Sequence, residues 1–128
     1  IYSKFESTVV KQLAERFPKL ARPLLAIDAR LIDLQAIAKQ HYYHPQQQGS
    51  WSLKAVLPTI APELRYDNLD EVQEGGMAMA AFREAIHPET PTERKAELER
   101  QLRAYCQRDT EALVRLWQHF TGRAALAR

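Results

Sequence analysis

Residues 98–120, LERQLRAYCQRDTEALVRLWQHF, predict a long amphipathic helix, and the rest of the sequence is best interpreted around it. Steps of three and four residues bring one set of side chains onto a single stripe of such a helix. The stripe consists of Leu98, Leu102, Tyr105, Asp109, Ala112, Leu113, Leu116 and Phe120. Only Asp109 is neither apolar nor aromatic, so a carboxylate is expected to face the protein interior.

The position of Asp109 allows two interpretations. A carboxylate in an apolar interior is costly unless it is protonated, hydrogen-bonded, paired or bound to a metal ion. Tyr105 lies one helical turn earlier on the same face, so its phenol and this carboxylate are expected to be neighbours. Alternatively, Asp109 is the N-cap of a separate last helix that begins at Thr110, and Tyr105 is an ordinary core aromatic.

Composition predicts one soluble globular domain over residues 1–128, because 45% of the residues are hydrophobic and 27% are charged. A net charge of +2 is compatible with a nucleic-acid partner without requiring one. The single cysteine, Cys106, excludes an internal disulfide and a multi-cysteine zinc site. It also favours a reducing, cytoplasmic location. The chain has no apolar run long enough to cross a membrane, so no membrane partner is expected.

The pattern along the chain predicts a mainly helical protein with about six helices and at most two short strands. Ser3 and Glu6 have the spacing of a capping box before a helix that Pro18 ends. A second helical segment is expected from Pro23 onward. Residues 31–34, Leu-Ile-Asp-Leu, are alternatively a short strand, because the stretch is too brief to show a period.

Further helix signals occur in the second half of the chain. Ser50 or Ser52 is expected to cap a short helix that Pro58 or Pro62 ends. Another helix is expected over residues 77–86. Thr90 is expected to be the N-cap of the long helix. That helix should end near Gly122, followed by a frayed tail over residues 123–128.

Several segments together resemble a bacterial domain of unknown function that is related to the DnaQ-like exonucleases of the ribonuclease H fold. These segments are Tyr2-Ser-Lys-Phe-Glu6, Arg30-Leu-Ile-Asp33-Leu, Tyr43-His-Pro45, Gly49-Ser-Trp-Ser-Leu-Lys54-Ala-Val-Leu-Pro58, Gly75-Gly76 and Tyr105-Cys-Gln-Arg-Asp109-Thr110. The resemblance implies that the chain is the C-terminal part of an α/β ribonuclease H-like domain.

The resemblance also implies 3′–5′ hydrolysis of DNA or RNA with two Mg²⁺ or Mn²⁺ ions held by four acids. Enzymes of this kind are called DEDDy when a tyrosine precedes the last acid. Asp109 would be that acid, and Tyr105 would help to orient the attacking water. Glu6 would be a second metal ligand, although this motif usually carries aspartate, and a capping-box role would also explain Glu6.

The first motif of these enzymes, Asp-x-Glu, has no match in the sequence and is expected before Ile1. Because two acids cannot readily hold two Mg²⁺ ions, we expect the chain alone to be inactive. Helices without their sheet would expose apolar stripes, so a homodimer or a rearranged helical bundle is expected.

Three further positions have both a chemical and a structural interpretation. Lys54 follows a helix start and could contact a substrate phosphate, or it is simply solvated. Asp33 is expected to make a structural hydrogen bond at a helix start. His41 and His44 would suit a metal only if they were helical, and Pro45 favours a loop. The alternative function is a non-catalytic helical module that binds nucleic acid or protein.

Overall fold

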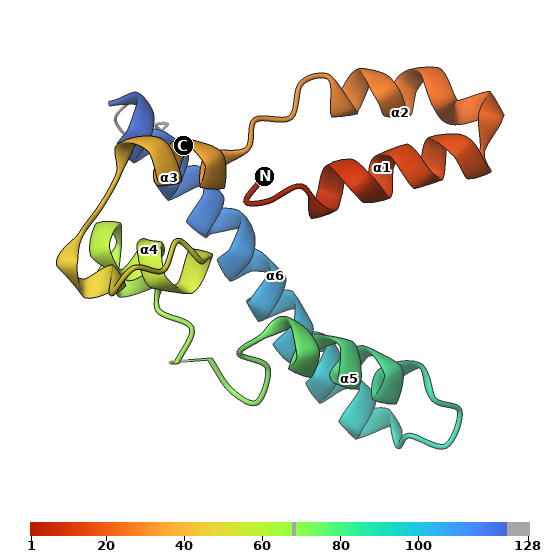
Figure 1. Ribbon diagram of the computed structural model, residues 1–128. Coiled ribbons are helices and arrows are strands. Elements are labelled where there is room, and N and C mark those ends of the chain that lie inside the picture. Colours follow the sequence, from red (N-terminus) through yellow and green to blue (C-terminus); the bar gives the residue numbers. More distant parts are fainter. Residues whose placement is uncertain (68, 123–128) are drawn as a thin grey trace. The chain divides into compact units, whose positions relative to one another are not determined.

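The computed structural model describes residues 1–67 and 69–122, and within these ranges the chain is mainly helical and contains no β-strand (Figure 1). The α-helices are α1 (Phe5–Arg16), α2 (Ala21–Asp28), α3 (Leu34–His41), α4 (Leu53–Ile60), α5 (Gly75–Ile86) and α6 (Thr92–Thr121). Three 3-10 helices are η1 (Pro18–Leu20), η2 (Pro45–Gln47) and η3 (Pro62–Leu64). The mainly helical prediction is confirmed, whereas the expected fraying of 123–128 concerns residues outside the described ranges.

The chain divides into two compact units, Ile1–Val56 and Leu57–Arg128. Among the residues that the structure describes, nine buried apolar side chains belong to the second unit and four, Ala14, Leu34, Ala38 and Val56, belong to the first. The first unit therefore has a small core. The assignment of residues 1–128 to one domain stays a prediction.

In the first unit, α1 and α2 form an antiparallel pair joined by η1 (Figure 1). Asp28, at the end of α2, connects the two helices. Its carboxylate accepts a hydrogen bond from Ser7 Oγ at 2.5 Å and lies 3.5 Å from the ammonium group of Lys11. These two contacts fix the register of the pair.

The predicted capping box at the start of α1 is wrong. Ser3 has a φ of 137°, which is not the extended conformation of an N-cap residue. The N-cap of α1 is Lys4 instead. Ser3 Oγ instead accepts a hydrogen bond from Phe5 N at 3.3 Å. Glu6 lies exposed in the first turn of α1.

Asp33 has the structural role that the sequence predicts. It is the N-cap of α3, and its Oδ1 accepts hydrogen bonds from Gln35 N at 2.9 Å and Ala36 N at 3.3 Å. The strand alternative for residues 31–34 is wrong, because Leu34 already belongs to α3. This segment does pair with the chain start, since Ile1 N donates to Ile32 O and Leu34 N donates to Ile1 O.

The segment after α3 is a compact loop held by its own side chains. The indole Nε1 of Trp51 donates to Tyr42 O at 2.9 Å. Gln47 is buried and bridges the loop, accepting from His44 N and donating to Ser50 O. The expected loop is thus confirmed, and His44 caps η2 instead of lying in a helix with His41.

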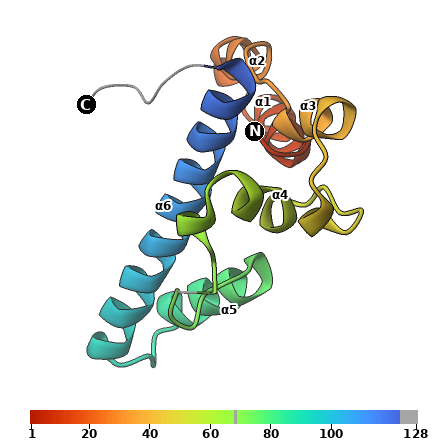
Figure 2. The same cartoon turned by 90° about the vertical axis from the view of Figure 1, so that its left-hand side faces the viewer.

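In the second unit, α5 runs antiparallel to the first part of α6 (Figure 2). Val72, Ala81 and Leu98 form the buried centre of this pair. Small side chains of α5, Ala78 and Ala85, pack around the same centre. Small residues at a helix contact leave room for the two backbones to approach each other.

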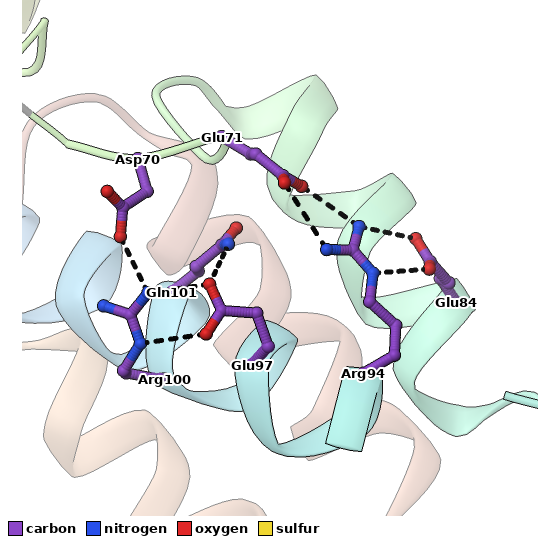
Figure 3. A network of polar contacts seen from close by, with 7 residues as sticks. All are labelled: Asp70, Glu71, Glu84, Arg94, Glu97, Arg100 and Gln101. Atoms are coloured by element: carbon purple, nitrogen blue, oxygen red, sulfur yellow. Dashed lines mark hydrogen bonds and ion pairs between the residues drawn. The ribbon is translucent and has the colours of Figure 1, made fainter. Parts of the chain in front are cut away.

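A network of ion pairs surrounds the start of α6 (Figure 3). Arg94 bonds both Glu71 and Glu84, and its hydrogen bonds lower the pKa of Glu84. Arg100 likewise bonds Asp70 and Glu97. Because Asp70 and Glu71 precede α5, the network connects that loop to α6. The pairs are exposed, so their main effect is on the position of the loop.

The long helix α6 is continuous over 30 residues, as its apolar stripe predicts. The predicted N-cap of this helix is wrong, whereas its predicted C-terminal end is confirmed. Pro91, not Thr90, is the N-cap, because Thr90 Oγ1 donates to Glu84 O instead. Gly122 ends the helix with a φ of 64°, as expected for a left-handed C-cap residue.

Candidate functional site

The three side chains of Tyr66, Tyr105 and Asp109 form a cluster in the second unit, which we call the phenol–carboxylate cluster. Asp109 lies inside α6, so the interpretation of this residue as the N-cap of a separate helix is wrong. Tyr105 precedes it by one turn of the same helix, as the sequence predicts. Tyr66 comes from the loop after η3, and its Oη donates to Asp109 Oδ1 at 2.5 Å.

The cluster is partly withdrawn from solvent. Tyr66 is only 7% exposed, whereas Tyr105 and Asp109 are half-buried. The rings of Tyr66 and Tyr105 are in tilted contact, with their centroids 6.1 Å apart. The carboxylate therefore lies at the edge of the core beside two aromatic rings, in an environment that favours strong polar contacts.

Both phenols stay protonated well beyond neutral pH. Burial raises the pKa of Tyr66, and its hydrogen bond to Asp109 and the negative charge of Asp109 raise it further. Burial also raises the pKa of Tyr105, with the charge of Asp109 and a hydrogen bond to it as additional causes. A protonated phenol is a donor, so Tyr66 and Tyr105 can both hold this carboxylate in a fixed orientation.

A second contact attaches the Tyr66 loop to α6. Arg108, next to Asp109 in the helix, donates from its guanidinium group to Arg65 O at 2.5 Å. Two neighbouring residues of α6 thus bind two neighbouring residues of the loop. The sequence analysis did not identify Tyr66, because residues 65–73 show no periodicity. A large aromatic residue isolated within such a polar stretch was the available signal.

Glu6 and Lys54, the other two predicted site residues, belong to the first unit, whereas the phenol–carboxylate cluster is built from residues of the second. Lys54 lies exposed in the first turn of α4, which Ser52 caps by accepting a hydrogen bond from Ala55 N at 3.3 Å. α4 then passes through Pro58 and ends before Pro62. The site roles of Glu6 and Lys54 stay predictions.

The described residues do not by themselves fit a two-metal centre. Across residues 1–67 and 69–122, no group of three or more His, Cys, Asp or Glu side chains lies close enough to hold a metal ion. The cluster provides one carboxylate, and one of its oxygens accepts the Tyr66 hydrogen bond. Mg²⁺ prefers six oxygen ligands, so the described residues of this cluster do not supply the set that two ions need.

Comparison with known proteins gives one partial match. The model of a family described as Domain of unknown function (DUF2779) matches residues 1–52. The match covers less than half of the chain, so we describe this chain as similar to that family over its first segment. It includes Glu6 and Asp33, whereas Tyr105 and Asp109 lie outside it. No curated protein and no solved structure matches the chain.

None of the helices in the part of the chain that the structure describes has the length and apolar character needed to span a membrane.

Proposed function

We propose that this chain is the C-terminal part of a metal-dependent 3′–5′ exonuclease-like domain of the ribonuclease H fold. The observation that carries the proposal is Asp109, a half-buried carboxylate inside α6 with a tyrosine one turn before it. This is the arrangement that the resemblance to DEDDy exonucleases requires of its last motif. Residues 1–52 are similar to a domain of unknown function, and the nuclease activity is our inference.

The proposal gives each residue a role in the complete domain. Asp109 and Glu6 would be ligands of Mg²⁺ or Mn²⁺, and Tyr105 would orient the attacking water. Tyr66 holds Asp109 through the bond from its phenol, so it is a positioning residue. Lys54 would contact a phosphate of the substrate at the start of α4. The expected cellular location is the cytoplasm.

The chain alone is expected to be inactive, because its described residues supply too few clustered acids for two ions. Incubation with Mn²⁺ and end-labelled single-stranded DNA or RNA should leave the substrate intact. Rapid degradation by this chain would show that its own residues suffice.

The role of Asp109 is tested in a complete protein that carries an Asp-x-Glu motif. Asp109→Asn keeps the shape of the side chain but removes its charge, so hydrolysis should fall by orders of magnitude while the protein stays folded. Glu111→Gln, at an exposed position two residues later in α6, is the matched control and should keep full activity. Equal activity of both variants would overturn the nuclease proposal.

A second candidate is a non-catalytic helical module that binds nucleic acid or protein. The Tyr66–Asp109 hydrogen bond favours it, because that bond explains a half-buried carboxylate without any metal ion. If Asp109→Asn unfolds the protein and has no separate effect on hydrolysis, the result favours a structural role of Asp109 in a non-catalytic module.

A further inference from the structure

The connection between α1 and α2 presents an unusual surface, which we call the hairpin tip: residues 16–23, RFPKLARP. Basic residues recur here every three positions, at Arg16, Lys19 and Arg22. Apolar residues recur with the same spacing one position later, at Phe17, Leu20 and Pro23. The centre of the segment is η1, the single 3-10 turn Pro18–Leu20, whereas Arg16 ends α1 and Arg22 and Pro23 lie in the first turn of α2.

All six of these side chains are exposed. Phe17 is 46% exposed and Leu20 is 54% exposed, although both are large and apolar. The guanidinium carbon of Arg16 lies 5.7 Å from the centre of the Phe17 ring, within cation–π range. Basic and apolar side chains thus both reach solvent at the tip, with an aromatic ring and a guanidinium group already in contact.

Few acidic residues lie near the tip in the sequence. No acidic residue occurs between Glu15 and Asp28, and Asp28 is already engaged by Ser7 and Lys11. Lys19 and Arg22 have no ion-pair partner within residues 1–67 and 69–122. The first unit as a whole carries eight Lys and Arg residues against four Asp and Glu residues. The tip is therefore the most basic exposed segment of a positively charged unit.

From this arrangement we propose that the hairpin tip binds single-stranded nucleic acid. Arg16, Lys19 and Arg22 pair with successive backbone phosphates, and a base stacks on Phe17. Proteins that bind single strands without sequence preference combine a basic track with an exposed aromatic ring in this way. The site lies on α1, η1 and α2 and is additional to the phenol–carboxylate cluster. The inference rests on the proposed nucleic-acid partner but does not need hydrolysis.

The other macromolecule that a basic and apolar surface can attract is an anionic membrane. Binding in a membrane interface usually requires a continuous amphipathic helix with a broad apolar face. The tip instead has two large apolar residues, Phe17 and Leu20, two prolines and a 3-10 turn. So small an apolar surface with one aromatic ring favours base stacking, and a membrane is an outcome of the test.

The test is fluorescence anisotropy of a fluorescein-labelled oligo(dT) of about 16 nucleotides, a length that one single-strand site can span. EDTA is present throughout, so hydrolysis plays no part. The tip variant is Lys19→Glu/Arg22→Glu. The matched control is Arg30→Glu/Lys39→Glu, which reverses two exposed charges elsewhere in the first unit. Phe17→Ala and Phe17→Leu test stacking, and circular dichroism checks that each variant is helical.

We expect the tip variant to weaken oligo(dT) binding at least tenfold more than the control does. The slope of log affinity against log salt should fall by about 1.4, since each phosphate contact on a single strand contributes about 0.7. Phe17→Ala should weaken binding roughly tenfold, and Phe17→Leu should not restore it, because leucine has no flat ring.

Equal losses in the tip variant and the control would overturn the proposal, because the binding would then be general charge attraction. The tip variant could instead keep its oligo(dT) binding and, unlike the control, lose binding to phosphatidylserine–phosphatidylcholine vesicles. That result would overturn the proposal and show that the tip binds a membrane. If the chain binds no oligo(dT), the tip proposal fails. The nuclease proposal is decided separately, by the effect of Asp109→Asn on hydrolysis in the complete domain.

Discussion

Asp109 is held by neighbours that the sequence shows only in part. Tyr105 follows from helical spacing, but the residue that donates the 2.5 Å hydrogen bond is Tyr66, 43 positions earlier. Helical periodicity connects residues within one helix and gives no information on which loop returns to it. The location of Asp109 on a half-buried face was therefore predictable, and the identity of its main partner was not.

Removal of the Tyr66 hydroxyl should destabilise the protein. Tyr66→Phe leaves the ring in place but removes the phenol that donates to Asp109 Oδ1, and hydrogen bonds to charged groups contribute about 1.5–3 kcal/mol. We expect a loss of this size in urea unfolding monitored by circular dichroism. Tyr43→Phe, at a ring that is 61% exposed, is the control and should change stability little. Equal effects of the two variants would contradict the proposed role of Tyr66.

Alkaline pH should lower the stability of the fold through the phenols of Tyr66 and Tyr2. Burial and Asp109 raise the pKa of Tyr66, and burial together with the charge of Asp33 raises the pKa of Tyr2 to about 12. An unfolded tyrosine titrates near pH 10, so the unfolded state loses these protons first. Stability is complete below about pH 10 and decreases as the pH rises toward 12.

Urea midpoints at pH 8, 10 and about 11 measure this loss. The decrease should be smaller in Tyr66→Phe than in the natural chain. Midpoints that are independent of pH, or that fall equally in both proteins, would show that Tyr66 titrates normally in the folded state.

At the scale of elements, α5 and α6 depend on small side chains at their contact. Ala81 is 7% exposed and packs with Val72 and Leu98. Ala81→Leu adds volume to a filled contact and should cost about 1–3 kcal/mol. Ala80→Leu, one position along on the exposed side of α5, should be nearly neutral. The stabilities of the two variants are compared by their denaturant midpoints. An unchanged midpoint in Ala81→Leu would mean that the contact between α5 and α6 is loosely packed.

The helices themselves were largely predictable, and their ends were less so. The stripe over residues 98–120 specifies most of α6, and Asp33 specifies the start of α3. Ser3 and Thr90 are standard N-cap types that do not occupy the cap positions, because Ser3 has a positive φ and Thr90 bonds the end of α5. Such end effects depend on contacts outside the helix, which spacing along the chain does not reveal.

At the scale of the whole molecule, much apolar surface is exposed on separate helices. Between Phe5 and Asp28 the exposed large residues include Phe5, Phe17, Leu20 and Leu25, and in α5 they include Met79, Phe82 and Ile86. Exposed apolar patches commonly indicate interaction surfaces. The expectation from the sequence that apolar stripes would be exposed agrees with these side chains, and self-association stays a prediction.

Self-association should be measurable by light scattering across a concentration series. We expect the mass to rise from that of one chain toward that of two as concentration increases. Phe82→Glu, on the exposed side of α5, should lower this tendency if α5 contributes to the interface, with Arg83→Glu as the charge control. A constant single-chain mass at all concentrations would rule out the predicted homodimer.

The central claim is that Asp109 takes part in hydrolysis in addition to accepting the hydrogen bond from Tyr66. A comparison of two variants tests this claim most directly. Mn²⁺-dependent hydrolysis of single-stranded DNA and the unfolding midpoint are measured for Asp109→Asn and Tyr66→Phe in a complete protein that carries an Asp-x-Glu motif. Tyr66→Phe removes the donor of the hydrogen bond, whereas Asp109→Asn keeps an amide oxygen that can still accept from Tyr66, so the midpoint of Asp109→Asn should be no lower than that of Tyr66→Phe. We predict that Asp109→Asn loses activity by orders of magnitude and that Tyr66→Phe keeps most of it. Equal activities in the two variants would contradict the claim.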